Sequence, residues 1–169
     1  TWKEELAKFC ISSEFNSKYQ ILSVLGEGSY GTVYLVQNIR SNEKLAAKAF
    51  KKSKLQYGDK KSLLKNEIKV MRKLNHPNIL KMHEVHETTD TIYVILEYIK
   101  DGELFNYIKN TKNIPKKVLI SIMTQLISTV EYLESKCIVH RDIKPSNIVF
   151  SPSVNDYVFC DFGISHPIA

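Results

Sequence analysis

A glycine-rich stretch at residues 26–33, GEGSYGTV, constrains the fold of this chain more than any other segment. The runs on either side of it, YQILSVL and TVYLVQNI, are rich in β-branched and aromatic residues, which favour strands. A dinucleotide-binding turn with the same G-x-G-x-x-G spacing opens a helix, whereas here the chain continues through Val33 as a strand. The stretch therefore predicts a β-hairpin whose backbone amides can approach a phosphate, because Gly26, Gly28 and Gly31 carry no side chains.

The sequence changes from β-rich to helical near residue 100. Upstream, short apolar runs separated by the turn-prone EGSYG, RSNE and ETTD indicate strands, and KSLLKNEIKVMRKL has the apolar spacing of one amphipathic helix. Strands are therefore expected at residues 19–28, 32–39, 44–50, 80–85 and 92–97, and the helix at 61–74. Downstream, helices are expected at residues 103–110 and 116–136, and a strand at 156–160. This order predicts an α+β protein with a five-stranded sheet and one helix, followed by a mainly helical region.

The N-terminal residues have a different character. Residues 2–10, WKEELAKFC, place Trp2, Leu6 and Phe9 at helical spacing, which predicts a short amphipathic helix packed beside the main domain. Residues 12–18, SSEFNSK, are polar and predict a linker. The chain does not begin with methionine, so we interpret it as a trimmed product.

Length and charge limit the class of protein and its partners. A chain of 169 residues can bury one substantial core or form two small lobes. With 24 Lys and Arg against 18 Asp and Glu, the formal charge is +6, and the excess is concentrated in residues 48–61, KAFKKSKLQYGDKK. No known nucleic-acid motif accompanies this stretch, so we expect no nucleic-acid partner. The longest uncharged stretch, residues 118–130, is too short and too polar to cross a bilayer, so we expect no membrane partner.

Cysteine and histidine usage argues for an intracellular protein without a zinc site. Cys10, Cys137 and Cys160 are odd in number, widely spaced and free of any CxxC motif, which favours reduced thiols. No secretion signal is apparent at the N-terminus, and we expect a cytoplasmic or nuclear location. His83 and His86 have an HxxH spacing, but no further ligand is near them, which argues against zinc.

Lys48, in the sequence LAAK, is flanked by apolar residues on an expected inner strand. A lysine in that position must be paired, because burial of a lone ammonium is very costly. Glu67, on the expected helix at residues 61–74, is the natural counter-charge. The pair could be purely structural, but the neighbouring glycine hairpin needs a cation to hold any phosphate that it binds.

Residues 140–147, HRDIKPSN, carry the side chains that phosphate chemistry needs. Asp142 can accept a proton from a hydroxyl nucleophile, Lys144 can neutralise a transferring phosphoryl group, and Asn147 can ligate a divalent metal. Asp161, in the sequence DFG, follows an expected strand and offers a second, harder oxygen ligand. Mg²⁺ suits one or two such oxygens together with the phosphates of a substrate. A surface loop could have this composition by chance, although its spacing is that of a functional site.

In order and spacing these motifs resemble those of the eukaryotic protein kinases. The matching elements are GEGSYGTV, LAAK, Glu67, HRDIKPSN and DFG. The resemblance begins at residue 19 and leaves residues 1–18 outside it as an extension. It implies a two-lobe fold, with a five-stranded antiparallel sheet and one helix at residues 19–99 and a partial, mainly helical lobe at 100–169. It also implies transfer of the ATP γ-phosphoryl group to a hydroxyl of a protein.

The resemblance further implies a role for each matching residue. Lys48, held by Glu67, would contact the α- and β-phosphates of ATP, and Lys144 would act beside Asp142, the base. Asn147 and Asp161 would hold Mg²⁺, or Mn²⁺ in its place. The hinge of the ATP pocket would use the backbone of Glu97 and Ile99, behind which Leu96 closes the pocket. The remaining positions expected to contact ATP are Leu25, Gly26, Gly28, Gly31, Val33, Ala46, Glu103 and Val149.

Further residues resemble particular kinase features. Lys144 followed by Pro145 resembles the serine/threonine-specific members, so the expected partner is a protein with a target Ser or Thr. The sequence YVILEYIKDGELFNYI is most similar to the calcium/calmodulin-regulated group. Arg141 resembles an arginine on which a phosphorylated activation loop docks. The stacked apolar column of an active kinase would comprise Met71, Met82, His140 and Phe162.

Kinase domains continue past the DFG motif into an activation loop and several helices that cover the lower lobe. The resemblance therefore predicts that this chain binds nucleotide but is poorly active or inactive alone. It also predicts self-association through the apolar face of the helix at residues 116–136. An ATP-binding, non-catalytic scaffold or regulatory module is the alternative interpretation, and a non-kinase nucleotide-binding enzyme is a third. Retention of Lys48, Asp142 and Asp161 favours the kinase, because a degenerate relative is expected to lose one of them.

Overall fold

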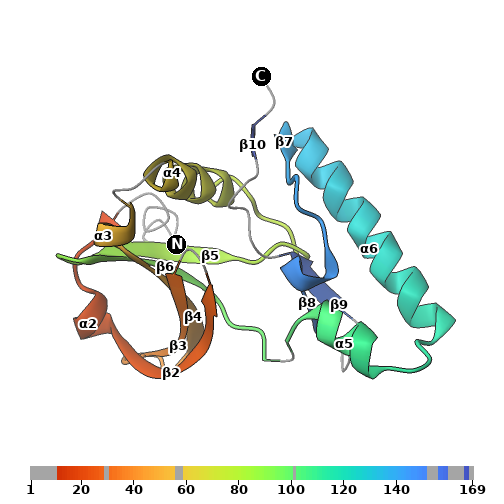
Figure 1. Cartoon of the computed structure of the whole chain (residues 1–169), viewed down its shortest axis with the longest axis horizontal. Helices are drawn as coiled ribbons and strands as arrows, with labels where there is room; N and C mark the ends of the chain where they lie inside the picture. Colours follow the sequence, from red (N-terminus) through yellow and green to blue (C-terminus); the bar gives the residue numbers. More distant parts are fainter. Residues whose placement is uncertain are drawn as a thin grey trace. The chain divides into compact units, whose positions relative to one another are not determined.

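The computed structural model describes residues 11–28, 31–55, 59–100, 102–151, 156–159 and 166–167. The chain divides into two compact units, and each has its own strands and helices (Figure 1). The first unit comprises Thr1–Ile68 and Lys81–Tyr98, and the second comprises Lys69–Leu80 and Ile99–Ala169.

The first unit is built on a sheet whose described strands follow the order β1-β5-β6-β4-β3-β2 (Figure 1). Strands β2 to β6 pair only in antiparallel fashion with one another, which confirms the five-stranded antiparallel sheet that the sequence predicts. Their bounds are β2 (Tyr19–Gly28), β3 (Gly31–Asn38), β4 (Lys44–Lys51), β5 (Met82–Glu87) and β6 (Thr91–Glu97).

The central strand β4 lies between β3 and β6 and is buried on both faces. Leu45 and Ala47 point to the core on one face, together with Val36 of β3 and Ile95 of β6. Because side chains alternate along a strand, Ala46 and Lys48 lie on the opposite face. The two faces of this one strand therefore separate the core of the unit from the side that carries the predicted phosphate-binding lysine.

The N-terminal segment adds an element that the sequence does not predict. Strand β1 (Ile11–Ser12) pairs in parallel with β5, and the short helix α2 (Phe15–Lys18) leads directly into β2. The side chain of Phe15 is buried in the core of the first unit. Residues 12–18 are therefore part of the fold, which differs from the polar linker expected for them. The helix expected at residues 2–10 lies outside the described residues.

Two helices follow β4: α3 (Lys52–Leu55) and α4 (Lys60–Met71). In α4, Leu64, Glu67 and Met71 are buried, and their spacing places them along one face of the helix. The helix ends three residues before the predicted end, because the next backbone bonds run from Lys73 to Val70 and from Leu74 to Met71. These i to i−3 bonds tighten the last turn before the sequence NHPN.

The second unit contains helices α5 (Leu104–Asn110) and α6 (Lys116–Ser135), both close to their predicted bounds. Its short strands form two antiparallel pairs. The members of these pairs are β7 (Ile138–Val139) with β10 (His166–Pro167), and β8 (Ile148–Ser151) with β9 (Asp156–Phe159). The NHPN segment is tied to α6, because the Asn75 amide donates to the Tyr132 hydroxyl (2.9 Å) and the Asn78 amide group donates to Gln125 (2.8 Å).

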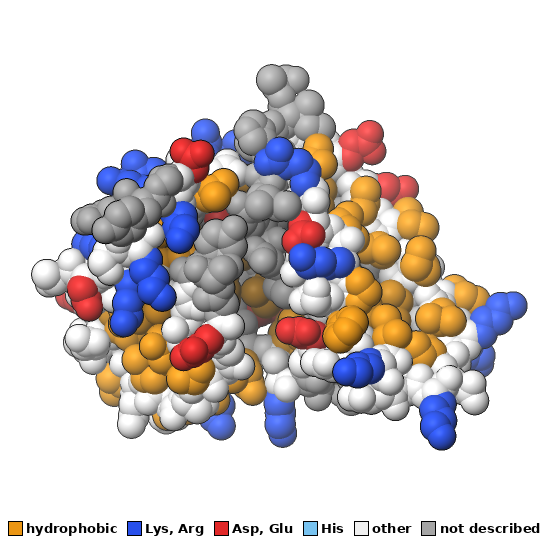
Figure 2. Space-filling view, in the orientation of Figure 1, with side chains coloured by type: hydrophobic (Ala, Val, Ile, Leu, Met, Phe, Trp, Pro, Cys, Tyr) orange, Lys and Arg blue, Asp and Glu red, His pale blue; other side chains and the backbone are white. Residues whose placement is uncertain are grey.

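Helix α6 has a buried and an exposed apolar side. Ile122, Thr129 and Leu133 are buried and form the inner side of the helix. Hydrophobic side chains gather over α6 in Figure 2. The exposed apolar residues of this helix are Leu119, Ile120, Met123, Ile127 and Val130. No helix in the described part of the chain is both long and apolar enough to span a membrane.

Candidate functional site

The glycine-rich hairpin is present, and its strands β2 and β3 pair down to the turn. Gly28 is the register partner of Gly31, and Gly26 is the partner of Val33; the two turn residues lie outside the described part. At Gly31 a Cβ atom would lie 2.0 Å from the carbonyl oxygen of Ala49 on β4, a separation that no side chain tolerates. A Cβ at Gly26 would meet no atom of the described chain within 4 Å. The two glycines thus serve different purposes, since Gly31 is required by strand packing and Gly26 leaves open space.

Lys48 and Glu67 form the ion pair that the sequence predicts. Lys48 Nζ, from β4, lies 2.7 Å from Glu67 Oε1, from α4. The lysine ammonium also lies 5.3 Å from the centre of the Phe50 ring, within the range of a cation–π contact. Val33 of β3 is the register partner of Lys48, which places the end of the glycine hairpin beside the ion pair. The first unit therefore presents a held cation next to glycine backbone, an arrangement suited to a phosphate.

The residues expected around an adenine ring lie on β4, on β6 and just after β6. Ala46 and Leu96 are register partners, and both are buried. The backbone amide of Glu97 donates to the Lys81 carbonyl (2.9 Å), and burial raises the pKa of the Glu97 carboxyl above its usual value. Ile99 belongs to the second unit. Two further positions, Leu25 on β2 and Val33 on β3, are exposed and half-buried respectively.

Asp142, Lys144 and Asn147 form a connected cluster in the second unit. Lys144 Nζ lies 2.8 Å from Asp142 Oδ2, and Asn147 Nδ2 donates to the same oxygen at 2.8 Å. Asn147 Nδ2 also donates to the Asp142 backbone carbonyl at 2.9 Å. The hydrogen bond from Lys144, followed by that from Asn147, lowers the pKa of the Asp142 carboxyl. Asp142 is therefore an ionised acceptor at neutral pH, which is the state that a general base needs.

Local backbone geometry fixes the start of this cluster. Arg141 adopts φ 67°, a left-handed conformation that is uncommon for a residue with a side chain. The backbone then turns back on itself, so that the Asp142 amide donates to Nδ1 of the buried His140 ring at 3.2 Å. A short 3₁₀ turn, Pro145–Asn147, follows and returns the Asn147 side chain to Asp142.

Glu103 and Val149 are brought together by the fold of the second unit. They form an isolated β-bridge between the start of α5 and β8. Beside them the Phe150 amide donates to the Gly102 carbonyl at 2.9 Å, and the Tyr107 and Phe150 rings lie 4.6 Å apart. Gly102 adopts φ 92°, a conformation that favours glycine. Glu103 and Val149, which are 46 residues apart in the sequence, are therefore neighbours in the second unit.

The structure describes some of the remaining predicted residues and leaves others outside its described part. Met71 and Met82 are buried, one in each unit, as is His140. His86 is engaged by Glu84, and the described residues contain no group of three His, Cys, Asp or Glu side chains that could hold a metal ion. The predicted positions that lie outside the described residues are Asp161, Phe162, Cys10 and Cys160.

A buried polar cluster around Glu84 is a feature that the sequence reasoning missed. Lys18 Nζ lies 2.6 Å from Glu84 Oε2, His86 Nε2 lies 2.9 Å from Oε1, and the Tyr19 hydroxyl donates to Oε1. Burial alone would raise the pKa of Glu84, but the hydrogen bonds from His86, Lys18 and Tyr19 outweigh it and lower the pKa to about 2. Phe15, a large apolar side chain within a polar run, is the sequence signal that could have revealed this packing.

Comparison with known proteins gives consistent relatives over the same stretch. The chain is 38% identical over 148 residues to the SNF1-related protein kinase catalytic subunit alpha KIN12 of Arabidopsis thaliana, covering 88% of this chain and 30% of the relative. It is 36% identical over 148 residues to CBL-interacting serine/threonine-protein kinase 12 of the same plant, with coverage of 88% and 30%. It is 40% identical over 153 residues to a Dictyostelium discoideum protein named "Probable serine/threonine-protein kinase MARK-C", with coverage of 89% and 20%.

The glycine-rich hairpin beside Lys48 and the cluster of Asp142, Lys144 and Asn147 match the residues that the resemblance to the protein kinases singles out. Residues 19–169 match the protein kinase domain family, and the chain therefore belongs to that family. The relatives' names confirm the resemblance to the serine/threonine protein kinases. The chain spans about a third or less of the length of these curated relatives.

Proposed function

We propose that this chain forms part of an ATP-dependent protein kinase that phosphorylates serine or threonine hydroxyls of a protein substrate. The observation that carries the proposal is the cluster of Asp142, Lys144 and Asn147, in which one carboxylate oxygen accepts from both neighbours at 2.8 Å. Such a cluster holds a charged acceptor in one orientation, as a residue that must position a hydroxyl nucleophile requires.

In this proposal Asp142 accepts the proton of the substrate hydroxyl as the hydroxyl oxygen bonds to the γ-phosphorus of ATP, and the bond from that phosphorus to the β–γ bridging oxygen breaks to release ADP. Its lowered pKa keeps the carboxyl ionised before the proton arrives. Lys144, whose side chain is half exposed at 51%, stands beside it and can turn to the negative charge of the transferring phosphoryl group. The preference for serine or threonine rests on Lys144 and Pro145 and on the relatives named above.

Two groups of residues would contact the nucleotide and its metal ion. Lys48, fixed by Glu67 at 2.7 Å, offers a cation to its phosphates beside the glycine hairpin. Asn147 fits the divalent metal of this family, because both of its hydrogen bonds to Asp142 use the amide nitrogen and neither uses the amide oxygen. Asp161 is the proposed second ligand. The bound Mg²⁺, or Mn²⁺, would neutralise charge on the phosphates.

A phosphorylation assay on defined peptides tests the proposal. The full-length protein that contains this chain is incubated with Mg²⁺ and ATP and with three peptides that differ only in Ser, Thr or Tyr at the target position, and phosphopeptides are identified by mass spectrometry. We expect the full-length protein to phosphorylate the Ser and Thr peptides but not the Tyr peptide, and we expect little or no phosphopeptide from residues 1–169 alone. Replacement of Mg²⁺ by Mn²⁺, and its removal by a chelator, examine the metal. Tight ATP binding without any phosphopeptide would overturn the proposal and favour a non-catalytic, ATP-binding module.

A further inference from the structure

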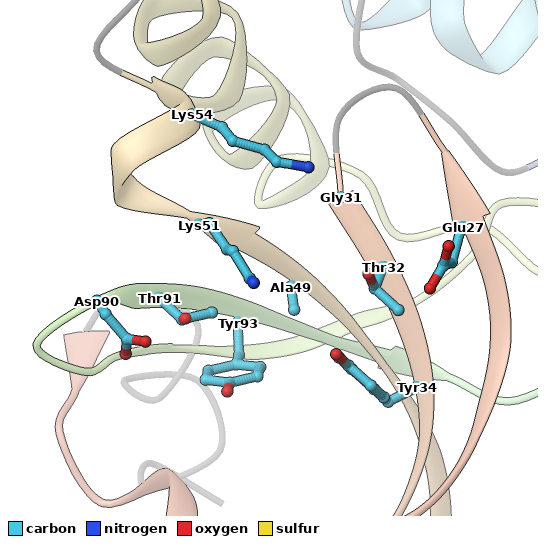
Figure 3. Close-up of a pocket in the computed structure, with 10 residues that line it drawn as sticks. All are labelled: Glu27, Gly31, Thr32, Tyr34, Ala49, Lys51, Lys54, Asp90, Thr91 and Tyr93. Atoms are coloured by element: carbon cyan, nitrogen blue, oxygen red, sulfur yellow. The ribbon is translucent and has the colours of Figure 1, made fainter.

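The first unit contains a cavity of about 380 Å³ whose lining shares only Gly31 with the positions expected to contact ATP (Figure 3). Its position in the sheet follows from strand register. Thr32 is the partner of Ala49, and Ala49 is the partner of Tyr93, and all three line the cavity. Lys48 directly precedes Ala49 in β4, so its side chain leaves the sheet on the other face. The cavity therefore opens on the sheet face opposite to the Lys48–Glu67 pair.

The walls of the cavity are partly aromatic. Tyr34 of β3 and Tyr93 of β6 are half-buried, and Ala49 and Thr91 are buried beneath them. The volume of about 380 Å³ lies at the lower end of the range for small-molecule sites, which suits a single ring with one polar group. Aromatic side chains bind such a ring by offset or edge-to-face contact.

Two lysines give the cavity a cationic side. Lys51 comes from the end of β4 and Lys54 from α3, and Figure 3 shows Lys51 reaching down toward Ala49 and Tyr93 and Lys54 reaching across toward Gly31. Neither lysine has an ion-pair partner within the described residues. Lys52, which lies between them in the sequence, is paired with Glu87 at 2.7 Å. The two lysines that line the cavity are thus available to an anion from outside the chain.

Two carboxylates, Asp90 and Glu27, also line the cavity. Asp90 accepts a hydrogen bond from the Thr88 hydroxyl (3.1 Å), and its backbone carbonyl accepts from the Lys52 amide (2.8 Å). Glu27 lies on β2, across the cavity from Asp90 in Figure 3. Neither carboxylate forms an ion pair with Lys51 or Lys54 within the described residues, so both ammonium groups can face an anionic group of a ligand.

We propose that this cavity is a ligand site for a small aromatic phosphate monoester, with the phosphate between Lys51 and Lys54 and the ring against Tyr34 and Tyr93. Two ammonium groups suit the dianionic charge of a phosphate monoester, and the tyrosine rings select an aromatic ester over the free ion. The site is separate from the nucleotide-binding face, so the proposal stands whether or not the chain transfers phosphate.

Ligand binding in this cavity would also stabilise the N-terminal segment. The Tyr93 ring stacks on the Phe15 ring, with centroids 3.7 Å apart and planes 5° apart. Phe15 anchors α2, the segment that precedes the family domain. A ring that contacts Tyr93 from the cavity stabilises this stack, and amide hydrogen exchange at residues 15–19 should slow by about tenfold when the site is filled.

The test uses phenyl phosphate as the probe, with inorganic phosphate as the free ion, in calorimetric titrations of the protein. We expect phenyl phosphate to bind with a dissociation constant of about 1 mM or lower, about tenfold tighter than inorganic phosphate. The Lys51→Met, Lys54→Met double variant should weaken phenyl phosphate binding by about tenfold or more. Lys44→Met is the matched control for loss of a surface charge, since Lys44 is an exposed residue of β4 that does not line the cavity.

The titrations and the melting temperatures together decide whether the proposed site exists. Both variants replace exposed lysines, so their melting temperatures should stay close to that of the parent and report whether the fold is intact. Phenyl phosphate that binds equally to parent, double variant and control would overturn the proposal, as would equal affinity for phenyl and inorganic phosphate. Displacement of phenyl phosphate by Mg²⁺ and ATP in direct competition would place it in the nucleotide site instead. Absence of binding at about 10 mM probe would also end the proposal.

Discussion

Lys48 Nζ lies 2.7 Å from Glu67 Oε1, and only 19% and 9% of the two side chains are exposed. The pair joins the central strand of the sheet to helix α4, two elements that are separated by α3 along the chain. Its shielding from water makes the attraction stronger than that of a surface pair, and it makes loss of one partner more costly. The geometry of the predicted phosphate-binding lysine therefore depends on the position of α4.

Glu67→Gln should weaken both the fold and nucleotide binding, because it leaves the Lys48 ammonium shielded and without its carboxylate. We expect a loss of about 1–3 kcal/mol in the free energy of unfolding, measured by urea denaturation. We also expect ATP affinity to fall by about tenfold in calorimetry. Lys52→Met is the control, since the Lys52–Glu87 pair is more exposed and should cost at most about 1 kcal/mol. Equal losses in the two variants would contradict this account.

In the full-length protein, Asp142→Asn should slow phosphoryl transfer while sparing ATP binding. The amide cannot accept the substrate proton, so the rate of phosphopeptide formation should fall by about 10²–10⁴-fold. The ATP dissociation constant should change little, because Asp142 is proposed to act on the hydroxyl rather than on the nucleotide. Ser135→Ala, on the last residue of α6, provides a control whose rate should match that of the parent. An unchanged rate in Asp142→Asn would refute the assignment of the base.

Two glycines of one motif should behave differently on substitution by alanine. Gly31→Ala places a methyl group 2.0 Å from the Ala49 carbonyl oxygen, so β3 and β4 must separate and the melting temperature should fall. We expect a loss of about 1–3 kcal/mol in unfolding free energy. Gly26→Ala meets no described atom within 4 Å, so it should leave the melting temperature unchanged. Loss of ATP affinity in Gly26→Ala at constant stability would assign that glycine to the nucleotide.

The sequence predicts the regular elements well where the pattern is local. The five strands of the sheet and helix α6 are found within a few residues of their expected bounds, because strand alternation and helical spacing are short-range signals. The Lys48–Glu67 pair is also predictable, since a buried lysine needs a carboxylate and the next helix offers one. The hydrogen bond between Tyr19 and Glu84 could not be predicted, because the two residues are 65 positions apart and nothing in their local sequence links them. The small strand β1 escapes prediction because two residues carry no periodicity.

Phe15→Ala should destabilise the first unit strongly, although Phe15 lies outside the family domain. The ring is 1% exposed, stacks on Tyr93 and packs edge-on against His86. Its removal should cost about 3–5 kcal/mol in unfolding free energy, which urea denaturation would measure. Phe105→Ala is the matched control, since that ring on α5 is 49% exposed and should cost less than about 1 kcal/mol. A small loss in Phe15→Ala would mean that the N-terminal segment contributes little to the core.

Stability in mild acid should depend on Glu84. Its pKa in the folded protein is lowered from the usual 4.5 to about 2 by His86, Lys18 and Tyr19. The ionised carboxylate therefore stabilises the fold above pH 4.5, and this contribution is lost as the pH falls toward about 2. We expect the difference in unfolding free energy between the parent and Glu84→Gln to be largest at pH 7. That difference should shrink steadily in urea titrations below pH 4.5, and a difference independent of pH would contradict the lowered pKa.

The parallel pairing of β1 with β5 affects where a recombinant fragment of this domain should begin. Without Ile11 and Ser12, β5 becomes the border strand of the sheet, and its backbone groups at Val85 and His86 lose their neighbours. Exposed strand borders invite pairing with other chains. A recombinant fragment that starts at Tyr19, where the family match begins, would therefore be more prone to aggregate than one that keeps residues 11–18. In this protein the match to the family therefore begins after the first strand of the sheet.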